Sequence, residues 1–357
     1  MSSIDQTIQQ INTATTIIIS IMYFVNFIFR VIGLTFNVFV FTRPSLRETP
    51  CSIYFLSSTF FNFFVILAII PLRLVLNNFN IDLATYNAQY CKIQYFAFYF
   101  IRALSCWFIA MACIDRYLHS SHNIFLRRMS SLKVAKLSVA IVSIVVPILY
   151  CHMIIFYNLI QVKKSSGIIA YSCIIQDTIY STFITIWHLF LYSFCPSFLM
   201  LIFGCLTLRS IRMHHQIIPQ NINNNRISRR TSIELLRMLS AQVLVIIIST
   251  SASSIYQLYA LFTSNVTKDT LRISQENAAG KILAVLSYFA HSTSFYMFTL
   301  TGSIFRKEVF KIIEQCSLYK RNRVHITGVQ THQMSSLQYN QQTNTILKNS
   351  AGQQRYS

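Results

Sequence analysis

Long apolar stretches alternate with short polar ones along most of this chain. A helix needs about 20 consecutive apolar residues to cross a bilayer, and runs of that length occur in seven places. They lie approximately at 17–42, 52–76, 92–115, 134–157, 179–208, 238–262 and 282–304. The pattern predicts an all-α membrane protein built as a seven-transmembrane helix bundle, and the low charged content of 11% agrees with a membrane class.

Basic residues are concentrated in alternate segments between the runs. Of the 30 Lys and Arg residues, 21 lie in 43–51, 116–136, 209–237 and 306–357, whereas the segments on the opposite side hold six. Cytoplasmic loops of membrane proteins carry such an excess, so the N-terminus is predicted to lie outside and the C-terminus inside. The net charge of +20 therefore indicates orientation and contact with anionic membrane lipid, not nucleic-acid binding.

The same pattern gives the expected boundaries. We expect residues 1–16 to form an extracellular N-terminus and residues 17–304 to form the seven-transmembrane domain. Residues 305–316 carry apolar positions at helical spacing with bases between them, which predicts a short amphipathic helix on the inner leaflet. Cys316 at its end is either a palmitoylation site or an ordinary surface cysteine. Residues 317–357, rich in Gln, Asn, Ser and Thr, are expected to be a disordered cytoplasmic tail.

Three residues with chemical roles fall in segments that are predicted to lie outside. Asn265 begins the sequence Asn-Val-Thr, which is a glycosylation acceptor. Cys91 opens the third run and Cys173 lies in the second outer loop, so both would face an oxidising compartment in which disulfides form. The sequence has no cysteine or histidine cluster with metal-binding spacing, and we expect no cofactor.

The third run ends on an adjacent acid and base, Asp115 and Arg116, followed by Tyr117. Arg116 lies 25 residues after Cys91, which corresponds to about 37 Å of helix. A single tilted helix can therefore carry the cysteine at the outer face of the membrane and the arginine at the inner face.

This Cys-to-Asp-Arg-Tyr helix, in a bundle of seven with its N-terminus outside, resembles the rhodopsin-like (class A) G-protein-coupled receptors over roughly residues 17–316. Further matches to the family pattern are Gly33 and Asn37 in the first run, Pro196 in the fifth and Phe305-Arg306 after the seventh. Other positions depart from it. Asn62 replaces the usual sodium-binding aspartate, helix six lacks its tryptophan and proline, and residues 294–298 replace Asn-Pro-x-x-Tyr. Such departures are typical of a divergent invertebrate receptor.

The resemblance implies a multi-pass receptor of the plasma membrane, not an enzyme, that transduces an extracellular ligand to a heterotrimeric G protein. It implies that Cys91 and Cys173 are paired, and that Asp115 holds Arg116 until helix six moves outward. Glu234, at the inner start of helix six, is expected either to accept Arg116 or to pair with a base along its own helix. The alternative for Asp115 and Arg116 is a solvated ion pair that only marks the membrane boundary.

Three arginines lie inside the runs, Arg30, Arg73 and Arg102, and the last two indicate the type of ligand. Arg73 lies near the outer end of the second run, and Arg102 lies 14 residues, about 21 Å, outward of Arg116. No acidic residue occurs in the outer halves of the runs to neutralise them. They therefore favour an anionic group, which a guanidinium binds through two hydrogen bonds. The alternative for Arg102 is a structural role, bonded to backbone carbonyls or to polar side chains such as Ser105.

Other expected pocket residues narrow the ligand class. Phe98 stands where amine receptors carry an aspartate, and Tyr288 stands roughly where opsins carry the retinal lysine, so neither an amine nor retinal is expected. The remaining expected lining residues, each of which is also a candidate for simple packing, are His188, Tyr256, Gln257 and His291. We therefore expect a neuropeptide or a small anionic chemosignal.

Two other functions fit the same composition. A transporter or channel for an anionic solute would use Arg73 and Arg102 along its path. Transporters often have repeated halves and helices interrupted by Gly or Pro, whereas this chain has seven glycines, six prolines and no visible repeat. A signalling-silent receptor homologue would account for the departures in helices six and seven.

Overall fold

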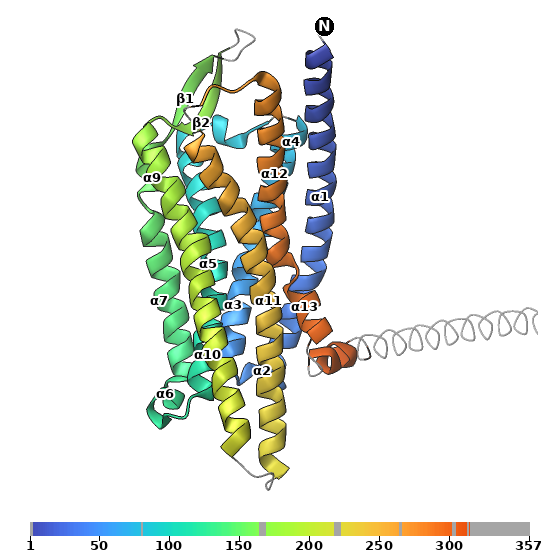
Figure 1. Ribbon diagram of the computed structural model, residues 1–357, viewed down its shortest axis with the longest axis vertical. Helices are drawn as coiled ribbons and strands as arrows, with labels where there is room; N and C mark the ends of the chain where they lie inside the picture. Colours follow the sequence, from blue (N-terminus) through green and yellow to red (C-terminus); the bar gives the residue numbers. More distant parts are fainter. Residues whose placement is uncertain are drawn as a thin grey trace, which may run out of the picture. The chain divides into compact units, whose positions relative to one another are not determined.

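The computed structural model of the chain describes residues 3–79, 81–163, 169–217, 223–263, 266–301, 305–312 and 314, and these residues are mostly helical (Figure 1). The chain divides into two compact units, Met1–Arg306 and Lys307–Ser357. In the second unit the described residues, 307–312 and 314, are helical. The first unit contains the bundle.

Helices occupy each of the seven predicted segments. In chain order the spans consist of α1 (Ser3–Phe41); α3 (Pro50–Phe64), η1 (Val65–Ile69) and α4 (Ile70–Phe79); α5 (Ala88–Ser120); α7 (Leu132–Tyr150) and α8 (Met153–Phe156); α9 (Thr178–His188), η3 (Leu189–Phe194) and α10 (Cys195–Ile217); α11 (Asn223–Phe262); and α12 (Thr270–Ser292) and α13 (Ser294–Thr301). The connections contain α2 (Pro44–Arg47), η2 (Leu83–Thr85), α6 (Ile124–Met129), β1 (Tyr157–Lys163) and β2 (Ile169–Ile175).

Six of these helices are long and apolar enough to cross a membrane. They are Ser3–Phe41, Pro50–Phe79, Ala88–Ser120, Leu132–Phe156, Thr178–Ser210 and Leu239–Phe262. The seventh predicted run, 282–304, is divided between α12 and α13, which meet at Thr293. Because α12 begins with polar turns and α13 has only 8 residues, neither has the length and composition of a span by itself. α12 packs against α1 and α11 as the seventh helix of the bundle, so the predicted fold class is confirmed.

Helix boundaries and one hairpin differ from the expectation. α1 begins at Ser3, well before residue 17, and α11 begins at Asn223, before residue 238. The loop between the fourth and fifth spans forms the antiparallel strands β1 and β2, in which Leu159 pairs with Cys173. Their β-branched and aromatic side chains favour paired strands. The hairpin lies at the same end of the bundle as the N-terminus (Figure 1).

Side-chain caps fix where several helices begin. Asn87, Asn123, Ser131 and Asp177 each accept a hydrogen bond from a backbone N–H in the first turn of α5, α6, α7 and α9. The first N–H groups of a helix have no partner within the helix, and short polar side chains at this position supply one. The starts of α5 and α9, which both carry cavity residues further along, are set in this way.

Two spans widen into π-helical turns, η1 and η3, just before a proline. In η3 the N–H of Cys195 bonds to the carbonyl of Phe190, five residues back. The next bond in that series would need an N–H at Pro196, which proline lacks. The carbonyl left without this donor is that of Leu191, and Trp107 Nε1 of α5 donates to it at 3.0 Å. The bond fastens the third span to the π-helical turn of the fifth.

The second tryptophan of the chain makes an equivalent bond. Trp187 Nε1 in α9 donates to the carbonyl of Leu149 near the end of α7 at 2.9 Å, where the last carbonyls of a helix lack intrahelical partners. An unpaired backbone group in apolar surroundings is costly, so each indole N–H stabilises a neighbouring span. Together the two bonds connect the third, fourth and fifth spans.

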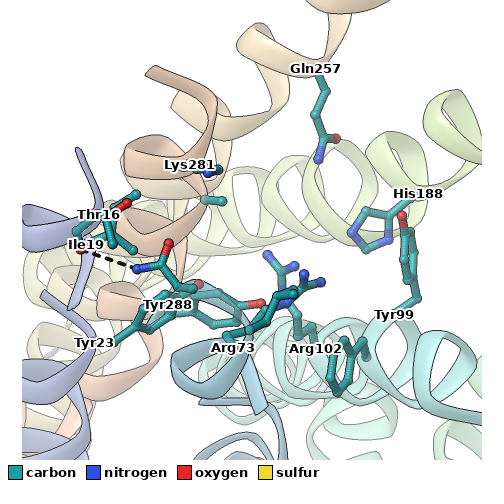
Figure 2. Close-up of a pocket in the computed structure, with 14 residues that line it drawn as sticks. Thr16, Ile19, Tyr23, Arg73, Tyr99, Arg102, His188, Gln257, Lys281 and Tyr288 are labelled. Atoms are coloured by element: carbon teal, nitrogen blue, oxygen red, sulfur yellow. Dashed lines mark hydrogen bonds between the residues drawn. The ribbon is translucent and has the colours of Figure 1, made fainter. Parts of the chain in front are cut away.

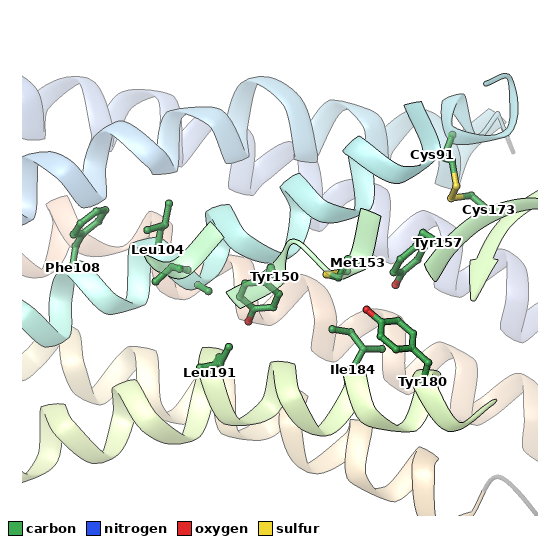
Figure 3. Close-up of a cluster of buried hydrophobic side chains, with 13 residues drawn as sticks. Cys91, Leu104, Phe108, Tyr150, Met153, Tyr157, Cys173, Tyr180, Ile184 and Leu191 are labelled. Carbon is green, nitrogen blue, oxygen red and sulfur yellow. A yellow bond between two sulfur atoms is a disulfide. The ribbon is translucent and has the colours of Figure 1, made fainter. Parts of the chain in front are cut away.

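Large side chains from these spans pack into one cluster that extends from the hairpin into the bundle (Figure 3). Its buried members include Leu104, Phe108, Tyr150, Met153, Tyr157, Tyr180, Ile184 and Leu191. Cys91 is disulfide-bonded to Cys173 at the end of this cluster, with Cα atoms 5.7 Å apart, so the predicted pairing is confirmed. The disulfide ties the start of α5 to β2.

The sixth and seventh spans approach each other closely at Gly280. A Cβ atom at this position would collide with the ring of Tyr256. The Tyr256 hydroxyl donates to the backbone carbonyl of Glu276 at 2.6 Å, which holds the ring in place. A side chain larger than glycine at this position would displace the Tyr256 ring from its place against α12.

We predict that Trp107→Phe lowers the stability of the bundle by about 1–3 kcal/mol, because the Leu191 carbonyl loses its donor while most of the ring packing remains. Thermal unfolding of the purified protein in detergent measures the change. Phe190→Leu, at an exposed position of the same π-helical turn, is the control. Equal melting temperatures for Trp107→Phe and the wild type would contradict the role given to this bond.

Candidate functional site

A cavity of about 490 Å³ lies where α1, α4, α5, α9, α11 and α12 converge (Figure 2). Its lining residues are Thr16, Ile19, Tyr23, Arg73, Leu76, Asn77, Phe98, Tyr99, Arg102, His188, Gln257, Lys281, Ala284 and Tyr288. The volume falls within the range of roughly 300–1,000 Å³ that is usual for small-molecule pockets. The lining combines aromatic rings with three cationic side chains.

Arg102 is held between two aromatic rings at the wall of this cavity. Its guanidinium carbon lies 4.7 Å from the ring centroid of Tyr192 and 4.7 Å from that of Tyr288. Its Nη2 donates to the Tyr192 hydroxyl at 3.3 Å and to Ser287 Oγ at 3.0 Å. Its Nε has no hydrogen-bond partner among the described residues. The hydroxyls of Tyr192 and Ser287 thus fix Arg102, and the Ser105 hydroxyl pairs with that of Ser58.

Arg73 reaches the cavity from the second span. Its guanidinium carbon lies 5.1 Å from the centroid of the Phe98 ring, and Figure 2 shows its side chain beside Arg102 and Tyr288. Phe98 therefore serves as a platform for a cation. Within the described part of the chain, no ion pair joins Arg73, Arg102 or Lys281 to an acidic side chain.

An acidic residue, Glu276, lies near the outer end of α12 but is engaged by other groups. Lys268 Nζ donates to Glu276 Oε2 at 2.6 Å, whereas Arg272 Nε at 2.8 Å and the Tyr259 hydroxyl at 2.7 Å donate to Oε1. These hydrogen bonds, foremost that from Lys268, lower the pKa of Glu276 to about 2. Glu276 precedes the apolar run that begins at residue 282, and none of the described carboxylates forms an ion pair with Lys281.

His188 connects the cavity to the packed cluster behind it. Its ring is stacked on Tyr192, with centroids 4.9 Å apart, and its Nδ1 is hydrogen-bonded to the Tyr150 hydroxyl at 3.0 Å. Tyr99 packs edge-on against the same imidazole at 4.5 Å. His188 is therefore both a lining residue and a packing residue, and its position fixes the ring that holds Arg102.

The structure brings most of the expected pocket residues together. Those that line the cavity are Arg73, Phe98, Arg102, His188, Gln257 and Tyr288. Tyr256 does not line it, because its ring packs on Gly280 and its hydroxyl is bonded to the backbone of α12. His291 lies in α12, but its side chain is outside the described part of the structure.

Several lining residues were not expected from the sequence, and Lys281 is the most important of them. The apolar run begins at residue 282, which predicts that Lys281 lies in an outer loop. The helix in fact begins at Thr270. Lys281 precedes Tyr288 by seven residues, which is two helical turns, so helical periodicity counted back from Tyr288 would have found it. Tyr23 and Tyr99 also line the cavity.

The ion pair at the other end of α5 is buried. Arg116 Nη2 lies 2.9 Å from Asp115 Oδ2, and the two side chains are only 5% and 4% exposed. Ser130 Oγ donates to Asp115 Oδ1 at 2.8 Å. The solvated alternative is therefore excluded for this conformation, since exposed surface pairs are open to water. Tyr117 packs against Phe203 of α10, with ring centroids 5.6 Å apart.

The remaining predicted sites lie at positions that the structure does not describe. The backbone of Glu234 belongs to α11, but its side chain is outside the described residues. Asn265 and Cys316 also lie outside them. Glycosylation, palmitoylation and the role of Glu234 therefore stay predictions.

Comparison with known families agrees with this arrangement of helices, disulfide and ion pair. The profile of the 7 transmembrane receptor (rhodopsin family) matches residues 33–296, which is well over half of the chain. The chain therefore belongs to the rhodopsin family of seven-transmembrane receptors and is a multi-pass membrane protein. A search of curated proteins found none that matches it.

We predict that Glu276→Gln destabilises the protein at neutral pH and that the difference from the wild type shrinks in acid. Because folding lowers the pKa of Glu276 from its ordinary value near 4.5 to about 2, its contribution is complete above pH 4.5 and is lost as the pH falls through 2. Melting temperatures of both proteins at pH 7 and pH 3 measure the difference. The exposed Glu48→Gln is the control, and a difference that does not change with pH would contradict the prediction.

Proposed function

We propose that this protein is a plasma-membrane receptor that couples an extracellular anionic ligand to a heterotrimeric G protein. The ligand is a small anionic chemosignal, or a neuropeptide whose anionic group enters the cavity. The observation that carries the proposal is the cluster of Arg73, Arg102 and Lys281 in one cavity, with no acidic side chain among its lining residues.

Electrostatics favours an anion in such a cavity. A guanidinium offers two parallel donors to a carboxylate, and charge-assisted hydrogen bonds contribute about 1.5–3 kcal/mol each. Arg102 Nε is buried and has no hydrogen-bond partner among the described residues, so the protein does not satisfy all the donors of this guanidinium. The rings of Tyr23, Tyr99 and Phe98 in the lining suit an apolar or aromatic body attached to the anionic group.

Ligand binding would reach the rest of the bundle through Arg102. An anion bound to this guanidinium competes with the hydroxyls of Tyr192 and Ser287, which now accept from it. Those hydroxyls belong to the fifth and seventh spans, so their release would loosen both spans from α5. A ligand shifts such an equilibrium only through a difference in affinity between two states, and the competition for Arg102 supplies that difference.

At the inner end, the buried Asp115–Arg116 pair represents the resting arrangement. Membership of the family implies that release of Arg116, as the sixth span moves outward, exposes it to the G protein. The exposed bases Arg127 and Arg128 on α6 would add an electrostatic docking face and contacts to anionic lipid.

We predict that benzoate stabilises the purified receptor more than benzamide or benzylamine, which share its ring but are neutral or cationic. Arg73→Gln is expected to weaken benzoate binding by about 10- to 100-fold, the equivalent of one charge-assisted contact. Thermal-shift titration measures the affinity, and Arg128→Gln, on the distant α6, is the matched control. Arg102→Gln should act in the same direction. Preference for benzylamine, or benzoate binding that survives both variants, would contradict an anionic ligand.

We predict that Arg116→Ala abolishes guanine-nucleotide exchange on a purified heterotrimeric G protein, with or without benzoate. Arg47→Ala, which removes an exposed base of α2, should retain most of the exchange. A wild-type receptor that binds benzoate but promotes no exchange would instead be a signalling-silent homologue. Anion flux through proteoliposomes that survives Arg116→Ala and is lost in Arg102→Gln would identify a transporter.

A further inference from the structure

A second cavity lies near the inner ends of the fifth and sixth spans. Its volume is about 210 Å³, and its walls come from Met200, Gly204 and Leu208 of α10, from Leu239 and Val243 of α11, and from Cys113 of α5. It shares no lining residue with the cationic cavity. The wall is apolar, and apolar cavities remain dry, so water is a poor occupant.

Gly204 creates this cavity. No heavy atom lies within 4 Å of the place where its Cβ would be, so the helix surface is hollow at this turn. Two rim residues, Leu208 and Leu244, are 43% and 56% exposed, and Cys205 is also exposed. Both helices belong to segments that are long and apolar enough to cross a membrane. The hollow therefore opens towards the hydrocarbon chains of the surrounding lipid.

Two basic side chains flank the cavity at its inner end. Arg209 follows Leu208 directly on α10, and Arg237 precedes Leu239 by two residues on α11, and both are exposed. Arg209 lies five residues beyond Gly204, about 7.5 Å along the helix. A phosphate held at the level of the arginines would thus have the first part of its acyl chain at the level of Gly204.

We propose that this cavity binds one anionic phospholipid of the inner leaflet, with an acyl chain seated over Gly204 and the phosphate held by Arg209 and Arg237. The acyl chain gains packing contacts in the hollow, but lipid tails elsewhere are equally apolar. Selectivity therefore comes from the charge of the head group. The site is separate from the cationic cavity and does not depend on the ligand proposed for it.

Photolabelling of the full-length receptor in phosphatidylcholine nanodiscs tests the proposal. The probes are phosphatidylglycerol and phosphatidylcholine with the same diazirine-bearing acyl chain, and the labelled peptides are mapped by mass spectrometry. We expect label on α10 and α11 around the cavity, more from phosphatidylglycerol than from phosphatidylcholine by about fivefold for each arginine. Excess unlabelled phosphatidylglycerol should suppress it.

Two sets of variants distinguish binding of the acyl chain from binding of the lipid head group. Gly204→Leu fills the hollow and should remove the label, whereas Phe198→Leu, on the exposed surface of the same helix, should not. Arg209→Gln with Arg237→Gln should abolish the preference for phosphatidylglycerol and leave acyl-chain labelling, whereas Arg47→Gln, at an exposed base of α2, should leave both unchanged. Should Gly204→Leu fail to fold, Leu244→Trp at the rim serves the same purpose.

Three results would overturn the proposal. The first is labelling that persists in both Gly204→Leu and Leu244→Trp. The second is equal labelling of the wild type by the two lipids. The third is a diazirine-bearing sterol that labels the cavity and displaces phosphatidylglycerol, which would assign the cavity to a sterol instead.

Discussion

Arg102 places a positive charge deep inside an apolar bundle, and the helices around it are arranged to accommodate that charge. A cation at this depth needs polar or aromatic partners from the protein or from a ligand, because the hydrocarbon chains of the lipid provide none. The described residues provide two rings and two hydroxyls, from Tyr192, Ser287 and Tyr288, and no carboxylate. The third, fifth and seventh spans are therefore held together by a residue that also faces the cavity.

The same requirement for internal partners governs the backbone of the neighbouring spans. Pro196 removes a donor from the fifth span, the helix widens into η3, and Trp107 supplies the missing N–H to the Leu191 carbonyl. On the opposite side, Arg30 is fully buried and its Nη2 donates to the backbone carbonyl of Tyr288 at 3.0 Å. The rings that hold Arg102 thus belong to segments that are themselves fixed by buried hydrogen bonds, which gives the guanidinium a defined place.

Local signals in the sequence were sufficient for the spans and for two of the three cations of the cavity, whereas the pairing of Cys91 with Cys173 was implied by the resemblance to the family. The length of the apolar runs identified the helices, and the distribution of basic residues predicted their orientation in the membrane. Arginines are rare inside membrane spans, and this rarity pointed to Arg73 and Arg102. What could not be predicted depends on contacts between distant segments. Tyr256 turns towards α12 because a glycine lies opposite, at Gly280. Tyr192 reaches Arg102 from a π-helical turn, in which the spacing of side chains differs from that of an α-helix. The periodicity of an α-helix therefore does not predict this contact. Lys281 was missed because an apolar run need not begin where its helix begins.

The arrangement of α5 and α10 indicates how the two ends of the receptor would communicate. Arg102 and Arg116 lie on one helix, and the Asp115–Arg116 pair at its inner end is closed and buried. Because both arginines lie on one rigid helix, ligand binding at Arg102 does not by itself separate Arg116 from Asp115. A neighbouring helix therefore has to transmit the change. η3 bonds to Arg102 through Tyr192 and continues directly into α10. α10 in turn packs on α5 beside Tyr117 and forms the hollow at Gly204. If both proposals hold, ligand and lipid act on the same helix from opposite ends, and the fifth span takes the transmitting role in a chain whose sixth span lacks the family's tryptophan and proline.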